Sequence, residues 1–439
     1  EMSASLVGSE MCIRDRMKRI SFFISFLLFA LCLVQGQTAK EEIVADINRS
    51  GGSYLAYTTN FTPQTQPPKG YKAFYISHYG RHGSRYLTKD IHYTRIIDIF
   101  TLAHNQHALT ALGEETYKRL QEVMKEADLR AGDLSPIGKQ QHRDIAERMF
   151  KSFPDVFKGN QSVCLRSTVA LRCNMSMIAF GDKLKSLNPN LQMDYDTGAK
   201  FMTYMNYMSP EGKLFKDTET GPWVEEFSKF KEAHYHPNRL IETLFNNSDF
   251  VSQNVNPINL MSGLYSIASD MQDVATNVSF YDLFTSDELY EMWKVDNLKC
   301  YIQRANYAGG NGVIPAAEKR LLTNILDCAD DVIKNGGKVA DLRFGHDGNI
   351  SPLFALMHIN DFAVSISDFN EVHKHWRNYK VVSMATNLQM IFFRNKKDPT
   401  DILVKFLHNE SEARIPIQTN TFPFYKWVDV ERFYRDLLK

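Results

Sequence analysis

A short apolar run that ends in a cluster of charges is the feature that most constrains this chain. KAFYI (72–76) is typical of a buried strand, and it leads into SHYGRHGSRY (77–86), which holds two His and two Arg. Like charges this close repel each other, and an Arg side chain is costly to bury without a partner. We therefore expect the loop after this strand to bind an anion.

Two further stretches repeat the pattern of a short strand followed by charged side chains. QSVCLRS (161–167) leads toward a helical stretch with Arg172, and GGKVADLRFGHDGN (336–349) ends in His346 and Asp347. Strands that alternate with helices predict an α/β fold in which helices cover a sheet. Ligands of such folds bind beyond the carboxyl ends of the strands, so we expect the three charged loops to meet.

The periodicity of apolar residues predicts the elements around these loops. Ser135 and Pro136 are a good cap and first residue for one of the helices. Helices are predicted at 104–129, 134–153, 168–187 and 428–439, and late strands at 379–395 and 402–409.

The composition changes in the middle of the chain. Residues 197–325 are rich in Tyr, Met and Phe and contain helical stretches such as SDELYEMWKVDNLKCYIQRAN (286–306). We expect a mostly helical inserted domain here, which would cap a larger three-layer α/β domain built from 37–196 and 326–439.

The first 36 residues are expected to lie outside the folded domain. MKRISFFISFLLFALCLVQG (17–36) has the basic start, apolar centre and small final residues of a secretory signal, with cleavage near Gly36. Residues 1–16 precede this complete signal and are interpreted as a non-native scar. The mature protein is expected to be exported, either to a periplasm or to the outside of the cell.

The overall charge excludes some classes of partner. Lys+Arg and Asp+Glu balance at 51 each, so nothing global directs the protein to nucleic acid or an anionic membrane. The mature chain has no segment apolar enough to span a membrane, and we expect a monomer that binds a small molecule. Any anion site must be a local concentration of positive charge.

The Cys and His content does not indicate a metal centre. No CxxC or Cys/His cluster has zinc spacing, and the HYH (234–236) and HKH (373–375) stretches have no carboxylate or Cys companions. The four Cys of the mature chain leave both disulfides and free thiols open. They are Cys164, Cys173, Cys300 and Cys328.

The three charged loops together predict phosphate chemistry. Arg presents a planar fork that matches phosphate oxygens, and a His between two Arg stays neutral and nucleophilic. Such an imidazole can attack phosphorus, and a nearby carboxylic acid can protonate the departing alcohol. Because the Arg cluster neutralises the phosphate, the reaction needs neither a metal nor another cofactor.

At these residues the chain resembles the histidine acid phosphatases. RHGSR (81–85) matches the RHGxR signature of that family, and GHDGNI (345–350) matches its HD motif. RSTVALR (166–172) and LSPIGKQQH (134–142) resemble its middle block and the start of one of its helices. The resemblance covers nearly all of the mature chain and implies a phosphoglycerate-mutase-like α/β domain with a smaller helical domain.

The resemblance also implies roles for individual residues. His82 would be the nucleophile and Asp347 the proton donor. The other implied positions all concern phosphate binding. Arg81, Arg85, Arg172 and His346 would bind the phosphate, and Arg166 is a weaker candidate that could instead stabilise its loop. Apart from the resemblance, a polyanionic substrate would need further cations outside the catalytic pocket; Lys89 is a weak first candidate, and Lys213 and Lys216 come next.

The substrate is less sharply indicated than the chemistry. RHGSRY, HPNRLIETLF and LRFGHD look most like the multiple inositol polyphosphate phosphatase branch, which acts on phytate. That branch usually carries HAE where this chain has His346-Asp347-Gly348, so a broad-specificity acid phosphatase is the first alternative. A phosphoglycerate-mutase-type transferase conflicts with the signal peptide. An exported anion-binding protein without turnover would have no need of Asp347.

Overall fold

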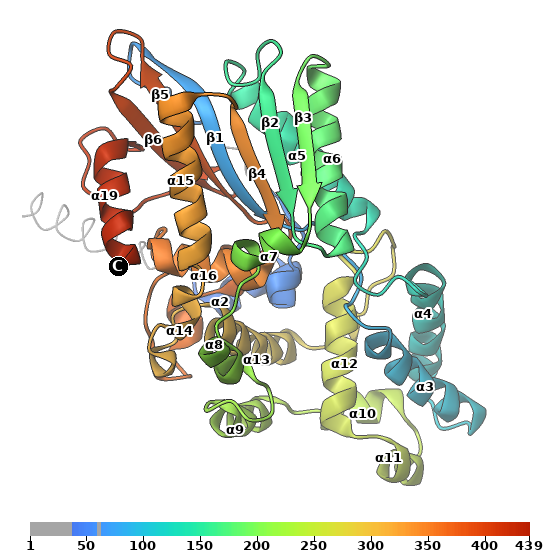
Figure 1. Ribbon diagram of the computed structural model, residues 1–439. Coiled ribbons are helices and arrows are strands. Elements are labelled where there is room, and N and C mark those ends of the chain that lie inside the picture. Colours follow the sequence, from blue (N-terminus) through green and yellow to red (C-terminus); the bar gives the residue numbers. More distant parts are fainter. Residues whose placement is uncertain (1–36, 59–62) are drawn as a thin grey trace, which may run out of the picture.

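A computed structural model describes residues 37–58 and 63–439 of the chain (Figure 1). The expected scar and signal peptide lie outside the described residues. The centre of the molecule is an eight-stranded sheet in the order β3-β2-β4-β1-β5-β6-β7, with β8 paired to β6. The strands are β1 (Tyr71–Arg81), β2 (Ser162–Ser167), β3 (Gln192–Thr197), β4 (Ala340–Gly345), β5 (Asn387–Asn395), β6 (Ile402–His408), β7 (Ser411–Glu412) and β8 (Phe424–Lys426).

Strand direction divides the sheet into two parts. The first four strands run parallel, with β4 paired to both β1 and β2. The later strands are antiparallel to their neighbours, from β5 against β1 onward. The carboxyl ends of β1, β2 and β4 therefore meet at one edge, as the sequence predicts for the charged loops.

Helices cover both faces of the sheet. On β1, Ile76 points into the core formed with α5 and α6, whereas Tyr75 and Tyr79 point into the core on the opposite face. Figure 1 shows α5 and α6 on one side of the sheet and α15 and α19 on the other. This three-layer arrangement confirms the expected mixed α/β fold class. The helices before 197 and after 318 are α2 (Ala39–Ala45), α3 (Ile91–Asn105), α4 (Ala111–Ala127), α5 (Pro136–Ser152), α6 (Leu171–Leu187), α15 (Lys319–Asn335), α16 (Asp347–Met357), α17 (Val372–His375), α18 (Asn378–Val381) and α19 (Trp427–Leu438).

Between these stretches the regular secondary structure of the described chain is helical, with loops between the helices. The helices there are α7 (Ala199–Met205), α8 (Pro210–Lys216), α9 (Val224–His234), α10 (Asn238–Leu244), α11 (Ser248–Asn254), α12 (Pro257–Asp270), α13 (Ser286–Arg304) and α14 (Val313–Ala316). The earlier helices α3 and α4 pack against α12 and α10, so two stretches of chain build this helical part. The expected boundary at 325 falls inside α15. The division into domains at 197 and 325 stays a prediction.

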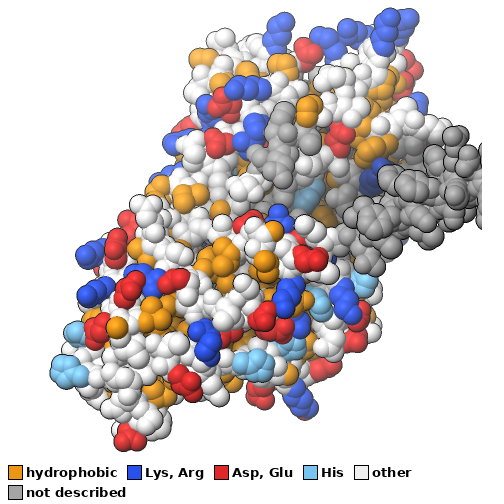
Figure 2. All heavy atoms as spheres, turned by 180° about the vertical axis from the view of Figure 1, so that it is seen from behind, with side chains coloured by type: hydrophobic (Ala, Val, Ile, Leu, Met, Phe, Trp, Pro, Cys, Tyr) orange, Lys and Arg blue, Asp and Glu red, His pale blue; other side chains and the backbone are white. Residues whose placement is uncertain are grey.

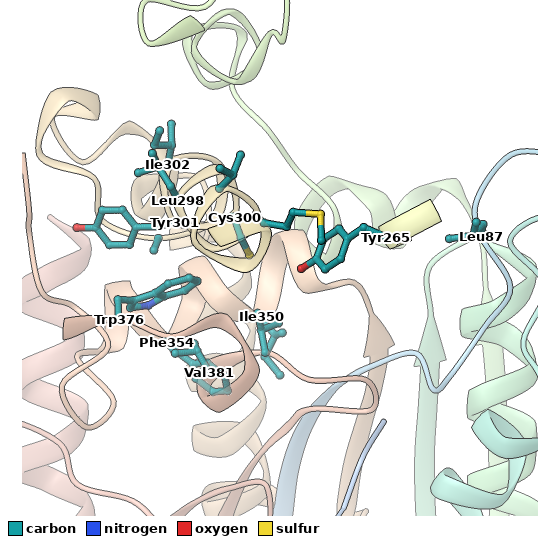
Figure 3. Packing of buried hydrophobic residues seen from close by; sticks show 14 of the residues in the cluster. Leu87, Tyr265, Leu298, Cys300, Tyr301, Ile302, Ile350, Phe354, Trp376 and Val381 are labelled. Carbon is teal, nitrogen blue, oxygen red and sulfur yellow. The ribbon is translucent and has the colours of Figure 1, made fainter. Parts of the chain in front are cut away.

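The packing of α13 on α16 joins the helical part to the end of β4. α13 and α16 are in contact, and Figure 3 shows Leu298 and Tyr301 of α13 in the same region as Ile350 and Phe354 of α16. These side chains belong to one buried core. The core fixes the end of α13 next to the start of α16, where the HD motif lies.

Two predicted elements differ from the structure. The helix expected from 104 is two helices, because His107 adopts a left-handed backbone with φ 55° and Thr110 caps a new helix by accepting a hydrogen bond from the Gly113 amide. The strand expected from 379 begins only at Asn387. Its first residues form α18, and Ala385 has a left-handed φ of 52° that separates helix from strand.

The structure also describes three features that the sequence analysis raised: membrane spanning, surface charge and the state of the cysteines. No helix in the described part of the chain is both long and apolar enough to cross a bilayer. Figure 2 shows Lys and Arg scattered among Asp and Glu on the face that it presents, without a large region of one sign. The four cysteines in the described part of the chain, Cys164, Cys173, Cys300 and Cys328, are free thiols.

Candidate active site

The three charged loops converge where β1, β2 and β4 end. Arg81, the last residue of β1, is paired with Gly345 of β4, and the backbone amide of His82 donates to the Gly345 carbonyl at 2.9 Å. On the other side of β4, Ser167 at the end of β2 is paired with Phe344. The register thus brings the signature loop, the middle block and the HD motif together.

His82 is buried and held in one tautomer. Its Nδ1 lies 2.9 Å from the carbonyl oxygen of Gly83 and must be the protonated, donating nitrogen, since a carbonyl only accepts. The Nε2 lone pair is therefore the free one. Burial, and then the charges of Arg81 and Arg85, hold the pKa of His82 well below its ordinary value. The ring therefore stays neutral in mildly acidic solution, with the lone pair on Nε2.

Three of the predicted arginines surround this ring. Arg81 is buried, and its Nη1 donates to the carbonyls of Ser53 at 2.6 Å and Val382 at 2.9 Å, which leaves its Nη2 facing the site. Arg85 stacks on the ring of Tyr54, with 5.0 Å from its guanidinium carbon to the ring centre. Arg172 lies in the first turn of α6, and burial lowers its pKa.

His346 lies beside His82, with 5.8 Å between the ring centres. Its Nε2 is 3.0 Å from the hydroxyl of Thr168, which belongs to the middle block. Burial, followed by the charge of Arg172, lowers the pKa of His346 to about 4. A neutral His346 can donate one hydrogen bond to a phosphate oxygen without competing for the role of nucleophile.

Asp347 begins α16 and is the carboxylate that faces the arginines. Burial alone would raise its pKa, but Arg304 and Arg81 overcome this effect and hold the pKa well below its ordinary value. The Nη2 atoms of both arginines lie 3.5 Å from its Oδ2. A dianionic phosphate among these arginines would offset their charge and raise the pKa of Asp347, which is what a proton donor requires.

Arg304 is a site residue that the sequence did not single out. It is the last residue of α13, far from the three motifs along the chain. Its Nη1 donates to Cys300 Sγ at 3.5 Å, and its Nη2 faces Asp347. The sequence predicted only that Arg304 lies near the end of a helix. It did not indicate which loop the end of that helix would contact.

Two buried carboxyl groups below the signature loop were also missed. Asp273 accepts a hydrogen bond from the hydroxyl of Ser84, and Asp270 accepts one from Tyr93 at 2.5 Å. Burial raises the pKa of Asp270 to about 7 and that of Asp273 well above its ordinary value. The charge of Arg85 favours the ionised form of both groups, but burial outweighs it.

The backbone of the signature loop lies directly against the start of α5. A Cβ on Gly83 would come within 2.5 Å of the Gly138 carbonyl oxygen, and one on Gly138 within 2.2 Å of the Ser84 carbonyl oxygen. Ser135 caps α5 and also donates to that Ser84 oxygen at 3.1 Å. This contact explains why the signature loop and LSPIG each need a glycine.

The two weaker candidates are placed differently from the rest. Arg166 forms an ion pair with Asp194 on β3 and stacks near Phe201, which accounts for it as a contact between strands. Lys89 is exposed near His92 and does not touch the catalytic groups among its described contacts. The structure therefore gives Arg166 a stabilising role, and Lys89 is an exposed residue with no contact to the candidate site among those described.

The remaining His-rich stretches lie away from this site. His234, in HYH, is 3.6 Å from Glu291, and the charge of Glu291 also acts on His373 of HKH. No group of three or more His, Cys, Asp or Glu side chains suited to a metal ion occurs within the described ranges. His78 packs between Phe180 and Phe344 in the core.

Comparison with known proteins assigns the family. A family model described as histidine phosphatase superfamily (branch 2) matches residues 80–409, which include the RHGSR, RSTVALR and HD motifs. The chain belongs to this superfamily. The resemblance seen in the sequence is thereby confirmed, and the convergent His, Arg and Asp side chains lie at the positions that this histidine phosphatase shares with the family motifs.

Individual relatives are similar along most of this histidine phosphatase. Multiple inositol polyphosphate phosphatase 1 of Gallus gallus is 21% identical over 320 residues, 70% of this chain and 69% of the chicken protein. The structure of a multiple inositol polyphosphate phosphatase from Bifidobacterium longum, solved with inositol hexasulfate, matches with a TM-score of 0.71 at 16% identity, covering 87% of this chain and 97% of that one. The phytase of D. castellii matches with a TM-score of 0.66 at 14% identity, covering 89% and 85%. At these identities the structural matches show a shared fold.

Proposed function

We propose that this protein is a metal-independent phosphomonoester hydrolase that acts through a phosphohistidine on His82, with phytate or lower inositol polyphosphates as substrates. The observation that carries the proposal is the free Nε2 of a neutral, tautomer-locked His82 within a ring of arginines. A nitrogen lone pair beside a bound phosphate is the arrangement that nucleophilic attack on phosphorus requires.

The first half of the reaction transfers the phosphoryl group to the enzyme. Arg81, Arg85 and Arg172 hold the phosphate oxygens, and His346 donates one further hydrogen bond. His82 Nε2 attacks phosphorus while the bond to the ester oxygen breaks. The leaving oxygen takes a proton from Asp347, so an alcohol departs and the phosphoryl group stays on nitrogen.

The second half returns the enzyme to its starting state. Asp347, now a carboxylate, removes a proton from a water molecule as that water attacks the phosphohistidine. The nitrogen–phosphorus bond breaks, inorganic phosphate leaves, and His82 is again neutral. The arginines neutralise the charge that develops on phosphorus, which is the task that Mg²⁺ performs in other phosphoryl-transfer enzymes.

The choice of substrate is supported by the relatives rather than by the catalytic groups. The chicken and Bifidobacterium longum proteins are named as multiple inositol polyphosphate phosphatases, and other structural matches are phytases. The chain departs from the HAE motif typical of the first group, since its proton donor is Asp347 and Gly348 follows it. The arginine pocket itself accepts any phosphomonoester.

A parallel assay on two substrates tests this proposal. Residues 37–439 are expected to release phosphate from phytate in preference to para-nitrophenyl phosphate at mildly acidic pH with EDTA present. After an alkaline quench, radiolabelled phosphate should remain on the wild type and be absent from His82→Ala. Comparable rates on both substrates would identify a broad acid phosphatase, and phosphate binding without release would favour an anion-binding protein.

Asp347→Asn separates the acid from the nucleophile in the same assay. Its rate on phytate should fall by about 10²–10⁴-fold, the usual contribution of a general acid. The loss in the phosphorylation step should be smaller for para-nitrophenyl phosphate, because para-nitrophenolate leaves without a proton. An equal loss in that step on both substrates would remove the acid assignment.

We also propose that the protein is exported and acts as a monomer. The signal-like sequence of residues 17–36 supports export. Expression of the full chain, followed by fractionation and N-terminal sequencing, should recover a protein that begins near Gln37 outside the cytoplasm. Recovery of uncleaved protein in the cytoplasm would contradict export, and light scattering measures the mass of the particle.

A further inference from the structure

One turn in the helical part of the molecule contacts the signature loop on both sides of Arg85. This turn, residues 270–273, follows directly on α12 and is called here the α12 turn. The Asp273 amide donates to the Asp270 carbonyl at 2.8 Å, which closes the turn. Both aspartate side chains are fully buried. They lie far along the chain from the three motifs, yet each carboxyl group takes part in a hydrogen-bonded relay to the signature loop.

The first relay holds Ser84, the residue before Arg85. Gln141 contacts Ser84 twice, because its Oε1 accepts from the Ser84 amide at 2.9 Å and its Nε2 donates to the Ser84 hydroxyl at 2.8 Å. The proton of that hydroxyl is therefore donated to Asp273. A backbone amide can only donate, so the direction of every hydrogen bond in this relay is fixed.

The second relay holds Leu87, two residues after Arg85. The Leu87 amide donates to the Tyr93 hydroxyl at 3.0 Å, and this hydroxyl donates to Asp270 at 2.5 Å. The direction is fixed here too, because the hydroxyl accepts from an amide and must donate its own proton to the carboxyl group. The two relays thus fix the backbone before and after Arg85.

Gln272, between the two aspartates, holds the segment that supports the Arg85 side chain. Its Oε1 accepts from the Ala56 amide at 3.0 Å, and its Nε2 donates to the Asn48 carbonyl at 3.1 Å. The same segment carries Tyr54, whose ring centre lies 5.0 Å from the Arg85 guanidinium carbon and whose hydroxyl accepts from Arg85 Nη2 at 3.4 Å. Arg85 Nε has no hydrogen-bond partner among the described residues, so this donor remains for an anion.

The α12 turn therefore reaches Arg85 by three routes, through Ser84, Leu87 and Tyr54. A long side chain loses rotamer freedom when it binds a ligand, and contacts that immobilise it beforehand reduce this loss. We propose that the α12 turn positions Arg85 for phosphate, with Asp273 as a positioning residue that acts through Arg85 and does not touch the phosphate itself. This inference rests on the proposed function, and it gives the helical part control over a phosphate ligand of the sheet edge.

A double-mutant cycle on phosphate affinity tests this role. Asp273→Ala should weaken the binding of inorganic phosphate, measured by calorimetry at mildly acidic pH, by about tenfold, as expected when a buried hydrogen-bond partner is removed. In an Arg85→Met background the same substitution should change the affinity by less than about twofold, because the side chain through which it acts is absent. Equal weakening in both backgrounds would show a general effect on the fold and overturn the proposal, as would unchanged binding for Asp273→Ala alone.

Two further variants separate positioning from misfolding. Burial raises the pKa of Asp273 well above its ordinary value, and Asp273→Asn supplies a neutral group whose oxygen can still accept from Ser84. This variant should bind phosphate as tightly as the wild type, and a loss as large as that of Asp273→Ala would overturn the relay. Tyr93→Phe removes only a hydroxyl from the second relay. It should weaken phosphate binding when Arg85 is present and not in the Arg85→Met background, and it serves in the same cycle if Asp273→Ala does not fold.

The matched control is a buried carboxyl group away from the site. Asp341 accepts from the Tyr75 hydroxyl at 2.7 Å near the start of β4, whereas the catalytic groups lie at the end of that strand. Asp341→Asn should therefore leave the phosphate affinity unaltered.

Turnover of phytate distinguishes this proposal from the proposed function. Coupling between Asp273 and Arg85 in phosphate binding, without release of phosphate from any ester, would support the positioning role and contradict the phosphatase assignment. Turnover by the wild type without such coupling would support the phosphatase assignment and overturn the positioning role.

Discussion

Asp347 has its charge state set by the two arginines that face it. Arg304 and Arg81 each place an Nη2 atom 3.5 Å from its Oδ2, and their attraction outweighs burial. Asp347 is therefore a carboxylate in this structure, whereas the proposed reaction begins with a carboxylic acid. In that proposal the proton enters together with the phosphate, either on the substrate or because the bound phosphate raises the pKa of Asp347.

Removal of Arg304 should raise the pKa of Asp347. Arg304→Met deletes the largest influence that lowers this pKa, so we expect the pKa of Asp347 to rise toward its ordinary value. NMR titration of the carboxyl carbon, assigned by comparison with Asp347→Asn, measures the change. Arg239→Met removes a surface arginine paired with Glu288 and should leave the titration unaltered. An unchanged pKa in Arg304→Met would show that Arg81 alone controls the carboxylate.

At the scale of elements, the site depends on a contact between two glycines. The loop after β1 crosses the first turn of α5 so closely that Gly83 and Gly138 have no room for a side chain. Ser84 and Ser135 add hydrogen bonds to this crossing. The helix thereby sets the position of the loop that carries His82.

Gly138→Ala should disturb both stability and activity. The new Cβ would meet the Ser84 carbonyl oxygen at 2.2 Å, and crowding of this kind costs about 1–3 kcal/mol of the free energy of unfolding. Urea denaturation measures the loss. Gly348→Ala is the control, because its nearest neighbour would be 3.9 Å away. Equal denaturation midpoints for Gly138→Ala and the wild type would contradict the close crossing.

Local patterns predicted most elements and the site residues that lie in the three sequence motifs. α5 begins where Ser135 and Pro136 predict, since capping depends on adjacent residues. The breaks at His107 and Ala385 were missed because a left-handed backbone in a non-glycine residue is imposed by surrounding packing. Arg304 was missed for a related reason. Its partner, Asp347, lies on a different helix, and only the packing of α13 on α16 joins them.

At the scale of the whole molecule, the candidate site joins the sheet to the helical part. His82, Asp347 and three arginines come from the sheet edge and the helices that start there, whereas Arg304 comes from the end of α13. A bound anion would contact side chains from both parts. Ligand binding is therefore expected to stabilise the molecule as a unit.

Phosphate should raise the unfolding temperature of the protein. Binding to the folded state alone stabilises it by about 2.7 kcal/mol when the free ligand is 100-fold above its Kd. Calorimetry with phosphate, and with chloride at the same ionic strength as the control, measures the shift. Arg172→Met should show a smaller increase at equal phosphate concentration. An identical response to phosphate and chloride would mean that the arginines do not bind the anion.

The hydrogen bond from His82 to the carbonyl of Gly83 has a consequence for how this protein tolerates change. Its acceptor belongs to the main chain, and every amino acid that could replace Gly83 brings the same carbonyl group. A substitution there can move the acceptor but cannot delete it. The tautomer of His82 is thus protected from point mutation. If an Asp or Glu side chain oriented the ring instead, one base change could remove that side chain.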